Sequence, residues 1–564
     1  MTPNAASASS GPSRRSFLAS TAIATAAVAG GMPLLAACGG SDSGSGGGTT
    51  SGKNAKKILP AYVASNVVTP DIPSKNGSAM GFTSKLDVDT LKTSVTKKLG
   101  KGGKVTIMSP YWGSPPKGNN PYYTGMNSLI GVDVEWRNQD GNTYDQKLGA
   151  VLASSDIPDV VVIPGWNMTG RIPSAIAGKF ADLGPYLSGD KIKEYPNLAA
   201  IPSDAWQRSI FGGKLMGLPM PAPYVQNIVP LYRQDIFDKE HYEVPKSADE
   251  FTALCKEITN PRAKRWACGD MKWTAFNTFG VISGGEKTLG WTVVDGKMIN
   301  RIETPEYLEA LEWARKLMAA GYVHPQFKLG KSQIGDPAPL FAAGEFLIWN
   351  DDISNWYGRQ ASQITQNPDF KCWGMDLWGH DGGNPKLWAA NPAGIFSFVN
   401  KKASESVIRD VLAVANVTAA PYGTKEWMMT NYGVEGTHYT LKDGVPVKND
   451  KGNNEVVNAF VMVASPAATI AHPDLPDYTK AMVEWQQRMG AFTQKSSFWG
   501  LQITEPNRYT NLADNFEQLE DDIVRGHKKI SDMQQAVSDW KKRGGDRLRD
   551  WYKKLLDENG SAAS

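Results

Sequence analysis

The chain has 564 residues, of which 41% are hydrophobic and 21% are charged, and this composition excludes wholesale disorder. A chain of this length is too long for one hydrophobic core, so we expect at least two lobes. The formal net charge of +3 provides no electrostatic footprint for a nucleic-acid partner. Tryptophan is as frequent as phenylalanine, at 18 residues each, which hints at aromatic surfaces used for something besides packing.

The first residues carry the features of an export signal. Arg14 and Arg15 precede a short apolar stretch, Ala19–Ala29, and the paired arginines indicate the twin-arginine route. This stretch is too short and too rich in alanine to be a stable transmembrane anchor. We therefore expect an exported protein.

The signal ends in Leu35-Ala36-Ala37-Cys38, which resembles the lipobox of bacterial lipoproteins. The resemblance implies that residues 1–37 are a signal peptide and that Cys38 is lipidated, which would anchor the protein on the extracytoplasmic side of the cell membrane. The alternative is an ordinary signal followed by a chance cysteine. Residues 38–102 begin with a Gly/Ser-rich stretch, so we expect them to form a flexible tether and an extended lead-in.

Beyond the lead-in, strands alternate with helices. The strongest strand patterns are Lys104–Met108, Val132–Trp136 and Asp159–Pro164, with helical spacing between the last two. The clearest helix follows Thr304-Pro305, which provide an N-cap and a first-turn proline, and it is expected to stop at Gly321. This alternation predicts an α/β fold with a largely parallel sheet.

No motif demands an enzyme. The six histidines show no HExxH spacing, no GxSxG motif is present, and the adjacent Asp351 and Asp352 are expected to point in different directions. The cysteines that remain after Cys38 include Cys255 and Cys268, which could form a disulfide in an oxidising exterior. They form no CxxC or Cys/His cluster, so we expect no structural zinc. No other motif implies a metal or a cofactor.

Several segments together resemble the extracellular solute-binding proteins of bacterial ABC importers, in the group that takes up carbohydrates and in its large oligosaccharide-binding lipoprotein subgroup. The segments are Gly213–Pro219, Leu231–Ile236, Val244-Pro245, Glu250-Phe251, Phe341–Trp349, Tyr432–Thr440 and Trp540–Asp546. Their order along the chain, behind a lipobox, carries the resemblance.

The resemblance implies a periplasmic-binding-protein-like fold, in which two α/β lobes are joined by a hinge and the ligand cleft lies between them. Lobe 1 would comprise residues 103–218 and 388–465, and lobe 2 residues 219–387 and 466–559. The implied function is reversible capture of a carbohydrate, most plausibly an oligosaccharide, and its delivery to the permease subunits of an ABC importer. We expect a monomer that is not an enzyme.

Candidate ligand-binding residues combine aromatic rings, which stack on the apolar face of a sugar, with polar groups that bind hydroxyls. They are Trp112, Trp166, Asn350, Asp351, Asp352, Asn355, Trp356, Trp388, Tyr432 and Glu435. Each has a structural alternative: the tryptophans could pack, Asp351 or Asp352 could cap a helix, and Glu435 could belong to a tight turn between Gly433 and Gly436. We expect Trp356→Ala to weaken binding without unfolding the protein.

Three other functions fit the same sequence. A secreted lipoprotein glycoside hydrolase would need two carboxylates that face each other across a groove. A binding protein for peptide or another polar solute would differ only in its ligand. A sensory lipoprotein would also show these features.

Overall fold

The computed structural model describes residues 57–112, 115–168, 172–225, 227–282, 290–329, 335–442 and 444–559. These residues belong to one compact unit, Ser45–Ser564. Cys38 and the expected signal peptide lie outside them. Among the described residues, no helix is both long and apolar enough to span a membrane.

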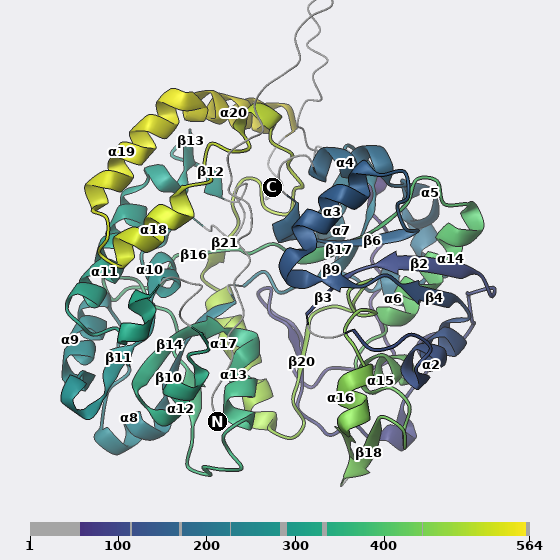
Figure 1. Cartoon of the computed structure of the whole chain (residues 1–564), viewed down its shortest axis with the longest axis horizontal. Coiled ribbons are helices and arrows are strands. Elements are labelled where there is room, and N and C mark those ends of the chain that lie inside the picture. Colours follow the sequence, from purple (N-terminus) through teal and green to yellow (C-terminus); the bar gives the residue numbers. More distant parts are fainter. Residues whose placement is uncertain are drawn as a thin grey trace, which may run out of the picture. The chain divides into compact units, whose positions relative to one another are not determined.

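Lobe 1 is built on a five-stranded sheet of order β4-β2-β6-β17-β9 (Figure 1). Its strands are β2 (Lys104–Met108), β4 (Asp133–Trp136), β6 (Val160–Pro164), β9 (Gly217–Pro221) and β17 (Ala393–Val399). Strand β2 runs parallel to β4 and β6, whereas β17 runs antiparallel to β6 and β9. The three strands predicted from the strongest sequence patterns are therefore present, with boundaries shifted by at most one residue in β4 and β6.

Helices cover this sheet and bury a core of aliphatic side chains. They include α2 (Pro121–Ile130), α3 (Tyr144–Ala153), α4 (Ile172–Lys179), α14 (Glu405–Thr418) and α15 (Lys425–Tyr432). The run Val160–Ile163 is fully buried because both faces of β6 are covered. In Figure 1 these elements are the blue and green ribbons around β2, β6 and β17.

Lobe 2 is built on a four-stranded sheet of order β11-β14-β10-β15. Its strands are β10 (Ile228–Arg233), β11 (Trp266–Cys268), β14 (Phe346–Asp352) and β15 (Cys372–Gly374). Strand β10 runs antiparallel to β14 and β15, and β11 runs parallel to β14.

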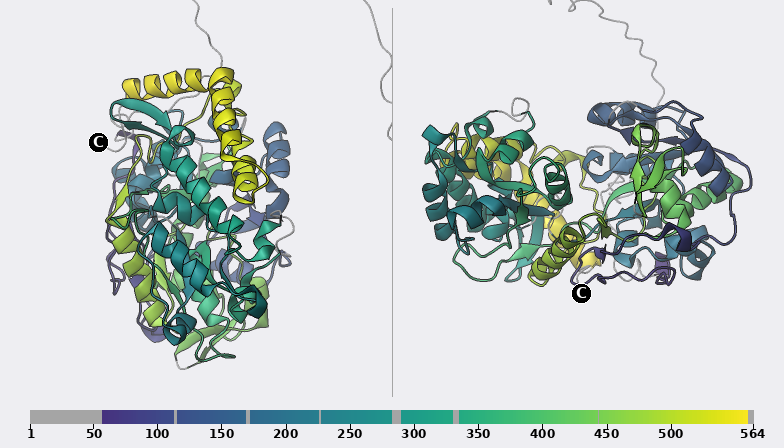
Figure 2. Two further views of the ribbon diagram at one scale, coloured as in Figure 1. Left: turned by 90° about the vertical axis from the view of Figure 1, so that its left-hand side faces the viewer. Right: turned by 90° about the horizontal axis from the view of Figure 1, so that it is seen from below.

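The helices of lobe 2 come from both halves of the chain. They include α8 (Gln234–Glu240), α9 (Ala248–Ile258), α10 (Lys272–Thr278), α11 (Pro305–Ala319), α13 (Ile353–Ala361) and α17 (Pro476–Gly490). The C-terminal helices α18 (Phe516–Val524), α19 (Ile530–Trp540) and α20 (Asp546–Asn559) are the yellow ribbons that lie against the teal helices in Figure 2. Helix α11 begins at the predicted proline and buries Tyr307, Leu311 and Leu317 on one face.

The two lobes have separate cores, and the chain passes between them three times. The crossings lie between β9 and β10, between β16 (Leu387–Trp388) and β17, and between Ala464 and α17. Backbone hydrogen bonds join the segments of the first two crossings. The N–H of Ala222 donates to Pro392 O (2.9 Å), and the N–H of Ala390 donates to Tyr224 O (2.8 Å). The indole N–H of Trp499 also donates to Ala390 O (2.7 Å), so the connecting strands are tied together.

The described part of the lead-in, residues 57–102, contacts both lobes, whereas the Gly/Ser-rich tether lies outside the described residues. Strand β1 (Met80–Phe82) pairs in parallel with β20 (Thr469–Ala471). The N–H of Ala79 donates to the Gln486 side chain of lobe 2 (2.8 Å), and the N–H and hydroxyl of Ser94 both donate to Glu426 of lobe 1 (3.0 Å each). Although it contains little regular secondary structure, this segment is held against both lobes.

The three described cysteines, Cys255, Cys268 and Cys372, are buried and free. The thiol of Cys255 lies on α9 against Cys268 of β11, and burial together with that neighbour raises the pKa of Cys255 well above its usual value. The disulfide considered for this pair is therefore not formed in the structure.

Candidate functional site

Two exposed tryptophans lie side by side at one edge of the lobe 1 sheet. Trp112 follows β3 (Pro110–Tyr111) and is 43% exposed, while Trp166 follows β6 and is 60% exposed. Their ring centroids are 6.5 Å apart, with an angle of 49° between the planes. Because β2 and β6 are parallel, the segments that follow them emerge at the same edge of the sheet. The pair forms an open aromatic surface.

The Trp112 ring packs directly against the backbone at Gly141. Gly141 lies so close to the Trp112 ring that a Cβ atom there would be 2.3 Å from it. A side chain at position 141 would therefore displace Trp112. This close packing fixes one ring of the pair while leaving its other face open.

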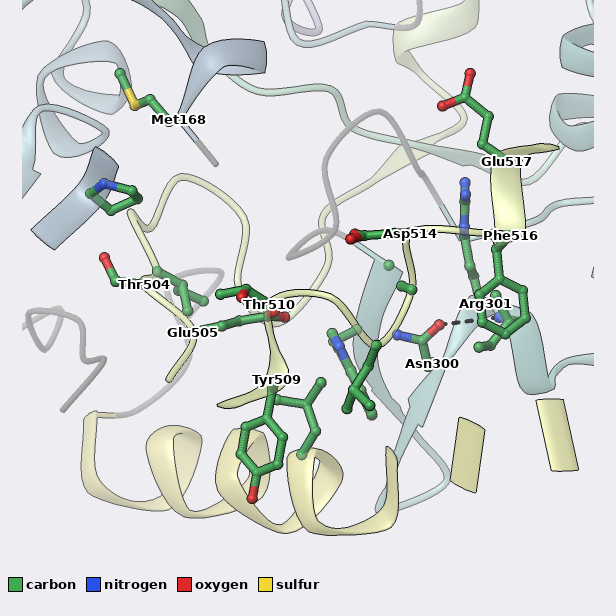
Figure 3. Close-up of a pocket in the computed structure, with 18 of the residues that line it drawn as sticks. Met168, Asn300, Arg301, Thr504, Glu505, Tyr509, Thr510, Asp514, Phe516 and Glu517 are labelled. Atoms are coloured by element: carbon green, nitrogen blue, oxygen red, sulfur yellow. Dashed lines mark hydrogen bonds between the residues drawn. The ribbon is translucent and has the colours of Figure 1, made fainter. Parts of the chain in front are cut away.

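A cavity of about 510 Å³ begins at Trp166 and is lined by residues of both lobes. Lobe 1 contributes Trp166, Met168, Pro173 and Arg208, and lobe 2 contributes residues that include Asn300, Arg301, Thr504, Glu505, Tyr509, Thr510, Asp514 and Glu517. Figure 3 shows Met168 across the cavity from Asn300 and Arg301, with Thr504, Glu505 and Thr510 between them. The cavity thus offers carboxylates, hydroxyls and an amide beside aromatic carbon, the mixture that suits a polyhydroxylated ligand.

Arg208 of lobe 1 donates a hydrogen bond to lobe 2 at the edge of this cavity. It lies at the C-terminal end of α7 (Ser203–Gln207), and its Nη1 atom donates to the carbonyl oxygen of Leu501 at 2.6 Å. The side chain is buried, so this bond is protected from water.

A third exposed tryptophan, Trp273, lies in lobe 2 at the start of α10, which follows β11. It is 36% exposed, and its ring packs edge-on against Phe276 at 5.6 Å. The guanidinium of Arg301, which lines the cavity, lies 5.8 Å from the Phe276 ring. Phe276 is buried, so Trp273 is linked to Arg301 of the cavity wall through the core of lobe 2.

A buried ionic cluster holds α10 against α18. Lys272 Nζ lies 2.6 Å from Asp521 and 3.4 Å from Glu520. Glu520 also accepts a hydrogen bond from the Tyr307 hydroxyl (2.8 Å), and burial followed by the charge of Glu520 raises the pKa of Tyr307 well above its usual value. Since Lys272 precedes Trp273, this cluster fixes the backbone that presents the exposed ring.

The polar residues predicted at the end of β14 form a network within lobe 2. Asp351 is almost buried and accepts hydrogen bonds from Asn355 (2.9 Å) and Arg359 (3.0 Å). Asp352 is the N-cap of α13, accepting from the N–H of Ser354 at 2.8 Å, as the structural alternative for these carboxylates had it. Asn350 accepts from the Thr274 hydroxyl (2.6 Å) beside Trp273.

Trp356 and Trp388 require a correction, because both are buried. Trp356 is 1% exposed, and its N–H donates to Cys372 O at 3.1 Å. Trp388 is 6% exposed, and its N–H donates to Gly280 O at 3.1 Å. Neither ring leaves a face open to a ligand, since one lies on the inner side of α13 and the other on β16 between elements of lobe 2.

Tyr432 and Glu435 lie in lobe 1, away from the tryptophan pair in sequence. Tyr432 ends α15 and is partly buried among Trp427 and Tyr439, with ring centroids 5.8 Å away in each case. Glu435 is exposed in the turn that follows. Burial, followed by the charge of Asp474 from the segment after β20, raises the pKa of Tyr432.

The structure brings together some of the predicted residues and adds others. Trp112 and Trp166 adjoin each other, and Asn350, Asp351, Asp352 and Asn355 are neighbours at the end of β14. Trp273 and the lining residues from Asn300 to Glu517 were not predicted from the sequence. For Trp273 a signal existed, because it follows Gly269-Asp270 at the end of a strand, as Trp112 and Trp166 follow theirs.

Comparisons with known proteins bear on the fold and the family. The family model of the bacterial extracellular solute-binding proteins matches residues 130–404, which confirms the resemblance found in the sequence. Lipoprotein LipO of Bacillus subtilis (strain 168) is 22% identical over 493 residues, which span 83% of this chain and 95% of that protein. The polygalacturonan/rhamnogalacturonan-binding protein YtcQ of the same organism is 24% identical over 55% of this chain and 61% of its own length.

Solved structures show the same architecture. The alginate-binding protein AlgQ2 superposes with a TM-score of 0.59, at 15% identity, over 81% of this chain and 98% of its own. The N-glycan transport solute-binding protein NgtS of Streptococcus pneumoniae superposes with a TM-score of 0.58, at 13% identity, over 81% and 98%. The fold is therefore periplasmic-binding-protein-like, with two α/β lobes, as predicted.

Proposed function

The chain is a relative of the bacterial extracellular solute-binding proteins, and from this premise we propose that it is the substrate-binding lipoprotein of an ABC importer for carbohydrates. It captures an oligosaccharide reversibly and delivers it to the permease. Relatives named for binding polygalacturonan, and structural neighbours named for binding alginate or transporting N-glycans, support a saccharide as the ligand.

The observation that carries this proposal is the placement of tryptophan. Of the 18 tryptophans, those with exposed rings among the described residues are Trp112, Trp166 and Trp273. All three follow strands: Trp166 lines the interlobe cavity, Trp112 lies beside Trp166, and Trp273 follows β11 in lobe 2. The apolar CH face of a pyranose stacks on an indole, and the hydroxyls at its edge bond to carboxylates and amides. Asn300, Glu505 and Asp514 provide such groups in the cavity wall.

We further propose that a lipid on Cys38 anchors the protein on the extracytoplasmic side of the membrane after export by the twin-arginine route. The first test is metabolic labelling of the full chain with a fatty-acid analogue. The label is expected in the wild type and not in Cys38→Ala.

The ligand test is a thermal-shift screen of the chain from Gly39 onward against mono- and oligosaccharides. A ligand at a hundredfold excess over its dissociation constant adds about 2.7 kcal/mol to the free energy of unfolding, which gives a readable shift. The strongest hit is then incubated overnight and analysed by mass spectrometry. An intact saccharide supports capture, and a cleaved one would replace this proposal with a glycoside hydrolase that uses the cavity carboxylates. Peptides are screened in parallel, and stabilisation by peptides alone would exclude carbohydrate as the ligand.

A further inference from the structure

The lead-in, residues 57–102, forms a loop that starts on lobe 1, reaches lobe 2 and returns to lobe 1. Lobe 1 holds the first leg of this loop by two hydrogen bonds. The Ser188 hydroxyl donates to Ile58 O (2.6 Å), and the N–H of Val63 donates to Ala199 O (2.9 Å). The side chain of Ile58 also packs against the core of lobe 1.

Lobe 1 also holds the returning leg. The ring centroid of Phe82 lies 4.4 Å from that of Tyr422, in the segment between α14 and α15. The N–H and the hydroxyl of Ser94 both donate to the buried Glu426 side chain on α15 (3.0 Å each). Both legs are therefore fixed to one lobe, and between them lies the tip of the loop, residues 73–80.

The tip is bound to lobe 2 through helix α17. The Asn76 side chain donates to Gln487 O (3.0 Å), and the Gln487 side chain donates back to Pro73 O (2.9 Å). The N–H of Ala79 donates to the side-chain oxygen of the buried Gln486 (2.8 Å). The tip and the legs of the loop are thus attached to different lobes.

Two glycines allow the tip to approach its neighbours closely. A Cβ atom at Gly490, the last residue of α17, would overlap the backbone oxygen of Asn76. A Cβ atom at Gly77, within the tip, would overlap the ring of Tyr224. Gly77 also has a φ of +78°, a conformation that glycine adopts most readily. The docked position of the tip therefore depends on glycine on both sides of the contact.

The tip also packs on the segments that connect the lobes. Tyr224 belongs to the first crossing, between β9 and β10. Strand β20, the partner of β1, belongs to the third crossing, and the N–H of Met80 donates to Ala468 O in that crossing (3.0 Å). Because the legs and the tip are attached to different lobes, rotation of the lobes about these crossings must strain the loop or release it.

We propose that residues 57–94 act as a clasp, which holds the two lobes close together and limits how far they open about the hinge. The clasp keeps a larger fraction of ligand-free molecules nearly closed. The apparent affinity of a protein rises with the populated fraction of its binding-competent state, so the clasp tunes ligand capture from outside the cavity. This inference concerns the motion of the lobes and holds whichever solute the cavity receives.

The test measures the distance between the lobes in ligand-free protein by double electron–electron resonance. Spin labels are attached at Gln146→Cys on α3 of lobe 1 and at Glu309→Cys on α11 of lobe 2, both exposed positions. The full chain carries Cys38→Ala, and the three described cysteines are buried, so they should not react with the label.

Two variants release the tip, and each has a matched glycine control. Gly490→Ala places a methyl group against the backbone of the tip, whereas a Cβ atom at Gly358, on α13 of the same lobe, meets nothing within 4 Å. Gly77→Ala places a methyl group in the ring beneath the tip, whereas a Cβ atom at Gly102, a second lead-in glycine with positive φ, meets nothing within 4 Å. Alanine favours a helix more than glycine, so α17 should persist in Gly490→Ala.

Hydrogen exchange of the peptide that spans Ala79–Phe82 reports whether the tip is docked. The wild type, Gly358→Ala and Gly102→Ala are expected to show slow exchange and one narrow interlobe distance. Gly490→Ala and Gly77→Ala are expected to show faster exchange and a mean distance longer by more than about 2 Å, the scale of a domain rearrangement.

Three results would overturn the clasp. Faster exchange with an unchanged interlobe distance would show that the docked tip does not restrain the lobes. Exchange that stays slow in both variants would show that the tip does not dock where the two glycines are required. A distance that lengthens equally in the controls would assign the effect to the loss of any glycine. If Gly490→Ala does not fold, Gly77→Ala and its control decide the question.

Discussion

The segments that follow β3 and β6 in lobe 1 expose their tryptophans, whereas the end of β14 and the helix that follows it in lobe 2 bury theirs. In lobe 1, Trp112 and Trp166 follow strands and are exposed. In lobe 2, Trp349 lies within β14 and Trp356 in the helix α13 that follows it, and both are buried. In the buried case, the ring N–H of Trp356 is bonded to a backbone carbonyl, and Trp349 packs on Phe341 and Phe346. An indole ring that stacks on a ligand needs one face open to solvent. Trp112 and Trp166 have such exposure, whereas Trp356 lies on the buried face of α13.

The largest effect expected from this comparison is on stability. Trp356→Ala should lower the free energy of unfolding by about 3–5 kcal/mol, because it removes a fully buried ring from the core of lobe 2 and leaves a cavity. Urea unfolding measures this change. Saccharide affinity of the folded fraction should stay as in the wild type. A variant with unaltered stability and lost affinity would instead return Trp356 to the ligand surface.

The exposed pair should behave in the opposite way. Trp166→Ala is expected to weaken saccharide binding roughly thirtyfold, about 2 kcal/mol. The substitution removes a ring that is exposed for stacking on the ligand and is not packed in the core. Its melting temperature should match that of the wild type. Tyr62→Ala, which removes an exposed ring of the lead-in, is the control for aromatic loss at the surface. Equal affinity in Trp166→Ala and wild type would contradict the comparison.

Trp273 tests whether lobe 2 contributes an open ring of its own. Since it is less exposed than the lobe 1 pair and packs on Phe276, we expect Trp273→Ala to weaken binding by about 1 kcal/mol, or roughly fivefold. Calorimetric titration with the saccharide identified in the screen measures the change. If Trp273→Ala leaves the saccharide affinity unchanged, only the tryptophans of lobe 1 stack on the ligand.

The smallest effect concerns pH. Burial lowers the pKa of His472 below its usual value of 6.5, and it likewise lowers that of His324. The unfolded chain then binds more protons than the folded one below that pH, so stability should fall as the pH drops through 6.5 and hold above it. Melting temperatures measured between about pH 5 and pH 8 check this, and His472→Gln should flatten the dependence. A profile that rises on acidification would contradict it.

Local patterns predicted the regular elements well. The apolar run at Val160–Pro164 predicted β6, and Pro305 in the first turn predicted the start of α11, because both signals lie within the segment itself. The Thr304 hydroxyl does not cap this helix, since it donates to Arg301 O instead (2.8 Å). The same local reasoning placed Trp112 and Trp166 at strand ends, where the structure leaves them exposed.

The site could be predicted only in part, because exposure depends on distant packing. Polar neighbours suggested a wet surface around Trp356, but they occupy the outer face of α13 while the ring occupies the inner one. Trp273 precedes a stretch that resembles a core helix, and its exposure follows from α10 being held by Lys272 against Asp521 of α18. The cavity wall near Glu505 comes from a loop whose position no local pattern encodes.

The parallel pairing of β1 with β20 constrains the order in which the protein can fold. Met80 of β1 pairs with Thr469 of β20, so β1 cannot form its ladder until most of the chain has been synthesised. Such distant pairing slows folding, because a long loop must close before its contacts form. The lead-in is therefore expected to dock as a late step, completing a molecule whose two cores are already formed.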